Sequence, residues 1–342
     1  MIEKGRRANH INGEYFRHHS VKSTFFIRPP LKISKTGDNS PASSLLKFVW
    51  RLSGWHQVFA CLAAILLTLL NLVPLELQRR IVNEVVETQD VEQLVRFGTF
   101  YVVVILLHQI GKFYLRLYQG WLTESATLYT RTHLLNVYDD GIEDDQTEEN
   151  GRAISIVGAE VEKLGGFVGD ALSQACANIA MLLGVAIYML VIEPVIAMFA
   201  LAVLLPQIML TPVIQRRLND LVEERIGLIR DMGDEISELD EEARDHCLSV
   251  VPEIYENRMK FMVLKFAMKS VLNLLNAAGP IAVLLFGGYM VMMGETQVGV
   301  IVAFLSGFDR LSSPIRELVS FYRVAAQASV QHRLIGDWMA KQ

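Results

Sequence analysis

The chain has 342 residues, of which 51% are hydrophobic and 20% charged, and its formal net charge is −5. So large an apolar share beside many charges indicates apolar blocks that alternate with charged ones. The weakly acidic balance gives no sign of nucleic-acid binding. The three cysteines have neither the spacing of a metal site nor that of a disulfide framework.

Residues 1–44 are polar and basic, so we expect a flexible cytosolic tail, either a plain leader or a segment that binds anionic lipid. The next segment, 45–55, is amphipathic, because Leu45, Phe48 and Leu52 share one helical face with basic residues opposite. This pattern predicts a helix on the inner membrane surface that leads into the first span.

Six apolar stretches are long enough to cross a bilayer, whose hydrocarbon core of about 30 Å needs roughly 20 residues of helix. They cover residues 58–77, 97–118, 168–192, 195–214, 266–293 and 298–321. The second is the weakest, because His108, Lys112 and Arg116 interrupt it. In the fourth, Pro206 and Pro212 predict kinks.

Lysine and arginine are distributed unevenly between the two sides of these spans. The tail and the segment between the fourth and fifth spans are rich in both, whereas the opposite side has only Arg79, Arg80 and Arg96. Because cytoplasmic segments carry the excess of Lys and Arg, we expect a multi-pass inner-membrane protein with both termini in the cytosol.

The connections between spans alternate between short and long. Glu193-Pro194 and residues 294–297 form short outer turns, whereas the inner segments 119–167 and 215–265 are long and keep a helical apolar pattern. Each long segment divides into two legs of roughly 20–25 residues, which as helices reach about 30–37 Å into the cytosol. The fold class predicted is therefore an all-α membrane protein with six spans and long cytosolic helical extensions.

This arrangement resembles the transmembrane domain of ABC exporters, the six-helix half of type IV ABC transporters, over residues 45–339. The residues that carry the resemblance are Pro74, Leu134-Leu135, Gly151-Arg152, Glu160-Val161, Gly287-Gly288-Tyr289, Ala303-Phe304, Pro314-Ile315 and His332-Arg333-Leu334-Ile335. One departure is Tyr138-Asp139, which stands where the family has an aromatic pair.

The resemblance implies that the two cytosolic turns are coupling helices that press on nucleotide-binding domains. They correspond to residues 143–150 and 235–242. The acidic residues at these coupling tips are Glu143, Asp144, Asp145, Glu235, Glu238, Asp240 and Glu241. The alternative interpretation is that they are solvated loop ends. The resemblance further implies a homodimer or heterodimer that encloses the pathway and moves by alternating access.

The sequence contains no G-x-x-x-x-G-K-[ST] phosphate loop and no catalytic constellation, so we expect a chain that is not an enzyme and binds no cofactor itself. It ends at residues 340–342, where the family's linker to an ATPase domain begins. The resemblance therefore implies a separate nucleotide-binding subunit that binds ATP, while this chain contacts membrane lipid.

Ionisable side chains inside a span are costly and usually face protein or a water-filled cavity. Asp309, near the middle of the sixth span, is the foremost candidate, and His108 or Lys112 of the second span can pair with it. Structural ion pairing and a role in substrate passage both remain open, as does proton coupling through Asp309 and His108. Adjacent Arg310 needs a partner of its own.

These observations leave three functions open. The first is the membrane subunit of an ABC-type transporter whose ATPase is a separate subunit. The second is a proton-coupled transporter of the same fold without an ATPase. The third is a membrane scaffold or regulator that transports nothing.

Overall fold

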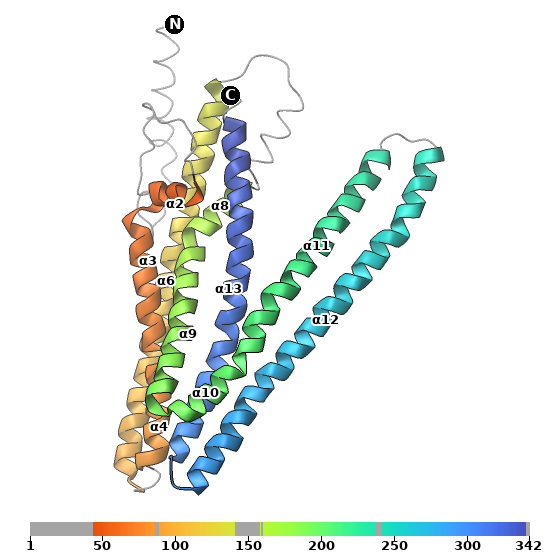
Figure 1. The fold of residues 1–342 in the computed structure, drawn as a ribbon. Coiled ribbons are helices and arrows are strands. Elements are labelled where there is room, and N and C mark those ends of the chain that lie inside the picture. The colour runs from red at the N-terminus through yellow and green to blue at the C-terminus, as the bar shows by residue number, and fades with distance from the viewer. Residues whose placement is uncertain (1–43, 86–88, 141–157, 159, 237–240, 340–342) are drawn as a thin grey trace, which may run out of the picture. The chain divides into compact units, whose positions relative to one another are not determined.

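The computed structural model describes residues 44–85, 89–140, 158, 160–236 and 241–339. All of these residues belong to one compact unit, 40–342. Within the described ranges every regular element is a helix and no strand occurs, which confirms the all-α class (Figure 1).

The membrane-length helices correspond one to one with the predicted spans. The first two consist of α3 (Trp55–Leu70), α4 (Val73–Arg80) and the π-helical turn η1 (Ile81–Val85), then of α6 (Val91–Asp140). The next two consist of α8 (Val161–Gly166), the π-helical turn η3 (Phe167–Ala171) and α9 (Leu172–Ile192), then of α10 (Pro194–Ala202) and α11 (Leu204–Ile236). The last two are α12 (Glu241–Met292) and α13 (Val298–Met339). Six of these runs are long and apolar enough to span a membrane, which confirms the predicted number.

The predicted amphipathic helix forms as α2 (Leu45–Ser53). Its first turn is capped by Ser44, whose side chain accepts a hydrogen bond from the Lys47 backbone N–H at 3.4 Å. The helix ends two residues before the predicted boundary, because Gly54 has a φ of 48°, which breaks the helical path. Val49 and Leu52 are buried against the protein, so the face predicted to be apolar is the packed one.

Two of the spans are broken, and in each the break lies just before a proline. Pro74 is the second residue of α4, and Pro206 is the third residue of α11. The first turn of a helix needs no intrahelical N–H donor, so proline is tolerated there. The kink expected at Pro206 thus appears as a break at Val203, while Pro212 lies inside α11.

The helices pack around two apolar clusters that lie in different parts of the unit. The first joins α4, α9, α10, the start of α11, α12 and α13 and includes Leu75, Met189, Phe304 and Phe308. The second joins α2, α6, α8, η3 and α13 and includes Val49, Leu134, Phe167 and Ala328. Only α13 and the run from α8 through α9 supply residues to both, so α13 is the central helix of the packed body.

The pair α11–α12 is different. These helices lie side by side and antiparallel over much of their length (Figure 1). Asn257 of α12 donates a hydrogen bond to Glu224 of α11 at 2.8 Å. The 52 residues of α12 span about 78 Å at 1.5 Å per residue. That length exceeds a hydrocarbon core of about 30 Å, so both helices must project well beyond the membrane.

Candidate functional site

The three ionisable candidates in the spans do not form an ion-paired cluster. Asp309 is exposed on α13 and Lys112 is exposed on α6, while His108 is half-buried within electrostatic range of Lys112 and Arg310. Among the residues that the structure describes, no ion pair joins Asp309 to His108 or Lys112. A role for these residues in substrate passage stays a prediction.

Arg310, expected to need its own partner, has one at the break between α3 and α4. Its Nη1 donates to the Asn71 backbone carbonyl and to Asn71 Oδ1, the latter at 3.2 Å. In an unbroken helix the Asn71 carbonyl would accept from the Leu75 N–H, which here bonds to Leu72 instead. Arg310 therefore satisfies a carbonyl freed by the break and holds α13 against it.

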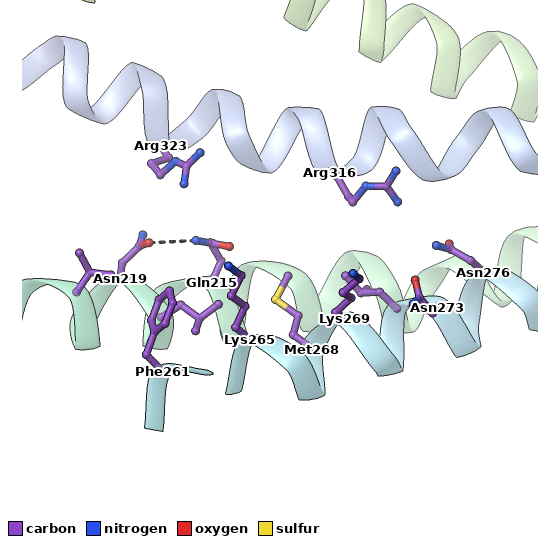
Figure 2. A pocket seen from close by; sticks show the side chains of 13 residues that line it. Gln215, Asn219, Phe261, Lys265, Met268, Lys269, Asn273, Asn276, Arg316 and Arg323 are labelled. Atoms are coloured by element: carbon purple, nitrogen blue, oxygen red, sulfur yellow. Dashed lines mark hydrogen bonds between the residues drawn. The ribbon is translucent and has the colours of Figure 1, made fainter. Parts of the chain in front are cut away.

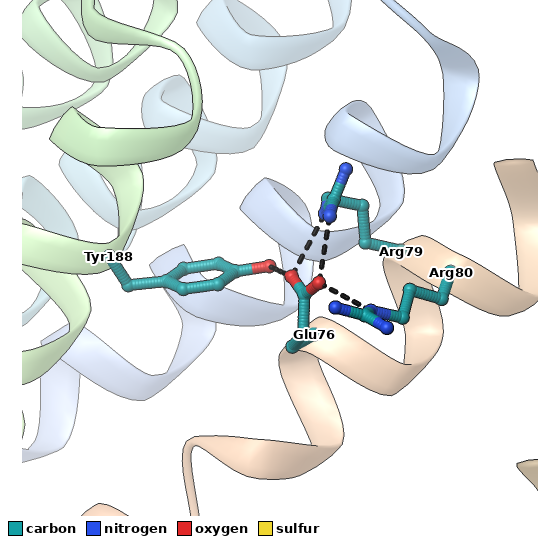
Figure 3. A network of polar contacts seen from close by, with 4 residues as sticks. All are labelled: Glu76, Arg79, Arg80 and Tyr188. Atoms are coloured by element: carbon teal, nitrogen blue, oxygen red, sulfur yellow. Dashed lines mark hydrogen bonds and ion pairs between the residues drawn. The ribbon is translucent and has the colours of Figure 1, made fainter.

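A second polar network connects α4 to α9. Figure 3 shows the Glu76 carboxylate at its centre, with Arg79, Arg80 and Tyr188 directed toward it. The Arg79 and Arg80 guanidinium groups donate at 2.7 and 2.8 Å, and the Tyr188 hydroxyl donates at 3.2 Å. All four polar groups find partners in one another, so we interpret this network as a structural clasp.

A hollow with a cavity volume of about 570 Å³ lies between α11, α12 and α13. Figure 2 shows side chains from α11 and α12 directed across it toward α13. The lining residues are Gln215, Leu218, Asn219, Val222, Phe261, Lys265, Met268, Lys269, Leu272, Asn273, Asn276, Arg316 and Arg323. We call this hollow the α12–α13 cleft.

The α12–α13 cleft is strongly basic. Lys265 and Lys269 of α12 face Arg316 and Arg323 of α13 across the gap, as Figure 2 shows. Its described lining includes four cations and no carboxylate. Four amide side chains add further hydrogen-bond donors. The cleft therefore has the chemistry of an anion-binding site.

Sequence reasoning missed this cleft, although a signal for it was present. Lys265 and Lys269 are four residues apart and Arg316 and Arg323 are seven apart, so each pair lies on one helical face. Cations at the ends of the fifth and sixth spans are also expected from the excess of Lys and Arg on the cytosolic side of a membrane protein. Their positions in the sequence therefore gave no reason to place the two pairs opposite each other. Only the packing of α12 against α13 brings the two pairs together.

The predicted coupling tips fall largely outside the described residues. This is the case for Glu143, Asp144, Asp145, Glu238 and Asp240. Glu235 lies in the last turn of α11 and Glu241 begins α12. The function of both tips stays a prediction.

A comparison with protein families matches residues 58–233 to the ABC transporter transmembrane region, which is just over half of the chain. The chain belongs to this family. The comparison with curated proteins finds no matching relative. The match runs from α3 to the last turns of α11 and so includes one leg of the α11–α12 pair.

Family membership fixes the general role of the chain. The matched region is the membrane part of an ABC transporter and not a catalytic ATPase domain. Together with the six spanning helices, it makes this chain a multi-pass membrane protein and a membrane subunit of an ABC-type transporter.

Proposed function

We propose that this chain pairs with a second six-helix chain and with a separate nucleotide-binding subunit, and moves its substrate across the inner membrane by alternating access. ATP is bound and hydrolysed by the partner, and this chain converts that work into rocking of two helical bundles. Both termini lie in the cytosol in this proposal.

The α11–α12 pair is the observation that supports this proposal most directly. From Gln215, where the apolar stretch of the fourth span ends, α11 continues to Ile236, or about 33 Å of helix at 1.5 Å per residue. The partner leg in α12 is stabilised against it by Asn257 and Glu224. Two helices that brace one another act as a rigid lever, and the tip on which a nucleotide-binding domain can act includes residues 237–240, between α11 and α12.

The distribution of cations supports the orientation. Arg216, Arg217, Arg225 and Arg230 all lie on the α11 leg, beyond the apolar part of the fourth span. Short segments next to spans that are rich in arginine stay on the cytosolic side. The lever therefore points toward the compartment that holds ATP.

The decisive experiment is mass spectrometry of the protein purified gently from its native membrane. We expect a stoichiometric ATPase subunit, which is lost when residues 237–240 are replaced by Gly and Ser. Replacement of the outer turn 295–297 is the matched control and retains the ATPase. Recovery of a dimer without any ATPase, from wild type and both variants, contradicts the proposal and favours a proton-driven transporter or a scaffold.

A further inference from the structure

We infer that the α12–α13 cleft binds an anionic amphiphile, meaning a molecule with a negatively charged head group on an apolar chain. That this amphiphile is the transported cargo rests on the function proposed above, whereas the binding itself does not. Three features of the cleft support this ligand class: its unbalanced charge, its apolar lining residues and its level along the spans.

The charge of the cleft is unbalanced within its own walls. The ammonium groups of Lys265 and Lys269 face the guanidinium groups of Arg316 and Arg323 (Figure 2). Like charges held on facing helices repel one another, and more so next to low-dielectric walls than in bulk water. An anion between the two rows turns this repulsion into attraction, so an anionic ligand stabilises the arrangement that the helices impose.

The described contacts do not neutralise these cations from within the protein. Arg323 makes a weak hydrogen bond to Ser320 at 3.4 Å, and Lys265 lies 5.9 Å from the centre of the Phe261 ring. Neither partner carries a negative charge. Guanidinium groups match the geometry of phosphate and carboxylate oxygens in pairs, which makes Arg316 and Arg323 suited to an oxyanion head group.

Apart from its cations and amides, the lining of the cleft is apolar. Leu218 and Leu272 line the cleft and are buried, and Val222 and Met268 line it and are half-buried. A cavity of about 570 Å³ lies within the roughly 300–1,000 Å³ typical of small-molecule sites. A small inorganic anion leaves this surface uncovered, whereas an amphiphile covers it with its chain.

The cleft lies at the level where an amphiphile changes from polar to apolar. Lys265 and Lys269 flank the start of the apolar stretch 266–293, and Arg316 and Arg323 lie near the end of 298–321. Cations at such positions keep their charge at the head-group level while their stems lie along apolar surface. A head group bound by them directs its chain toward Leu272, deeper along the span.

The test uses the full chain in phosphatidylcholine nanodiscs, without any ATPase, and titrates dodecyl phosphate. Two comparison ligands separate the features: dodecyltrimethylammonium has the chain with the opposite charge, and inorganic phosphate has the charge without the chain. The variant K269Q/R316Q removes one cation from each wall. Its matched control, K260Q/R333Q, removes one exposed cation from each of the same two helices outside the cleft.

We expect dodecyl phosphate to bind more tightly than either comparison ligand. Loss of two charge-assisted contacts weakens binding by at least about tenfold in K269Q/R316Q. The control K260Q/R333Q binds as wild type does. A third variant, K269R/R316K, keeps both charges and retains most of the affinity, which separates a charge effect from misfolding.

Several outcomes overturn the inference. They are equal affinity of wild type and K269Q/R316Q, equal binding of the cationic amphiphile, and loss of affinity in K269R/R316K to the level of K269Q/R316Q. Dissociation of the dimer in K269Q/R316Q with unchanged dodecyl phosphate affinity also overturns it, and assigns the cleft to contact between two copies of the chain.

A second arm distinguishes the source of the amphiphile. The protein is reconstituted with phosphatidylglycerol and examined by native mass spectrometry. A resident membrane lipid is supported if wild type retains phosphatidylglycerol, K269Q/R316Q loses it, and the bound lipid prevents dodecyl phosphate from binding. Displacement of phosphatidylglycerol by dodecyl phosphate supports a cargo site. If dodecyl phosphate binds but no ATPase co-purifies from the native membrane, this inference holds and the proposed function fails. If an ATPase co-purifies but dodecyl phosphate does not bind, the proposed function holds and this inference fails.

Discussion

The helices α12 and α13 both span the membrane, but they differ in the environment that surrounds them. The most apolar window of α13 is 56% buried inside the unit, whereas that of α12 is 17% buried. Their mean hydropathies run in the opposite order, 1.3 for α13 and 1.7 for α12. The less apolar helix is thus the more buried one.

The difference shows that the mean hydropathy of a helix indicates whether it can cross the bilayer, but does not predict how deeply the helix is buried among the other helices. A helix that faces lipid must be apolar over its exposed surface, whereas a helix inside the bundle can carry polar groups that find partners in its neighbours. On α13, Ser312 donates to Asn276, and the Gly299 N–H donates to Asn83 at 2.6 Å. These contacts hold α13 in place, and Ser312 is one of the polar side chains that lower its hydropathy.

The largest expected effect comes from replacing a phenylalanine by alanine on each of the two helices. Phe308→Ala on α13 leaves a cavity where the ring was fully buried, and we expect it to lower the free energy of unfolding by about 3 kcal/mol. Phe266→Ala on α12, where the ring is 58% exposed, changes it by less than about 0.5 kcal/mol. Thermal unfolding in detergent, followed by tryptophan fluorescence, measures both. Equal shifts would show that α13 is not the central helix.

The next largest expected effect concerns the contribution of a polar contact of α13 to stability. Arg310→Gln removes the donor to the Asn71 carbonyl, and we expect a loss of about 2 kcal/mol because a charged hydrogen-bond partner is removed. Asp309→Asn, the exposed neighbour, is the control and leaves the unfolding temperature unchanged. The same control variant keeps full transport in an ATP-driven protein. Loss of transport in Asp309→Asn would instead support proton coupling.

A smaller effect is expected at the clasp between α4 and α9. Glu76→Gln keeps the shape of the side chain but removes the charge that Arg79 and Arg80 contact. These groups are partly exposed, so we expect a loss of about 1 kcal/mol. Glu295→Gln, in the exposed turn before α13, is the matched control. Hydrogen exchange of the α4 amides checks the result, since unchanged protection would rule out a clasp.

The smallest effect belongs to the lever. Lys260→Ala removes an ion pair with Glu256 on the surface of α12, where the two side chains are 63% and 70% exposed. Exposed pairs of this kind contribute about 0–0.5 kcal/mol. Stability and ATPase stimulation should therefore both match wild type. A marked loss would indicate that this face of α12 contacts another subunit.

Much of the fold was predictable because it depends on local patterns. The spans were recognisable as apolar stretches, and α2 forms where the amphipathic pattern predicted a helix. The break before α11 was predicted only as a kink near Pro206, since proline perturbs the turn that precedes it and the sequence does not say how far.

The candidate site was harder to predict, because it depends on which helices are neighbours. Asp309 was selected for its depth in a span, yet it is exposed and without an ion pair to the second span among the described residues. Arg310 is the neighbour that makes the structural contact. One residue along a helix rotates a side chain by about 100°, so adjacent charges meet different surroundings.

The sequence by itself determined the number of spans, the long helical legs and the family, because a bilayer imposes the length and apolarity of each span independently of the others. Only the tertiary structure decided that α13 is the central helix, that Arg310 satisfies the broken end of α3, and that four cations face one another across a cleft. Those outcomes depend on helix neighbours and rotations, which interhelical packing sets and local composition does not encode.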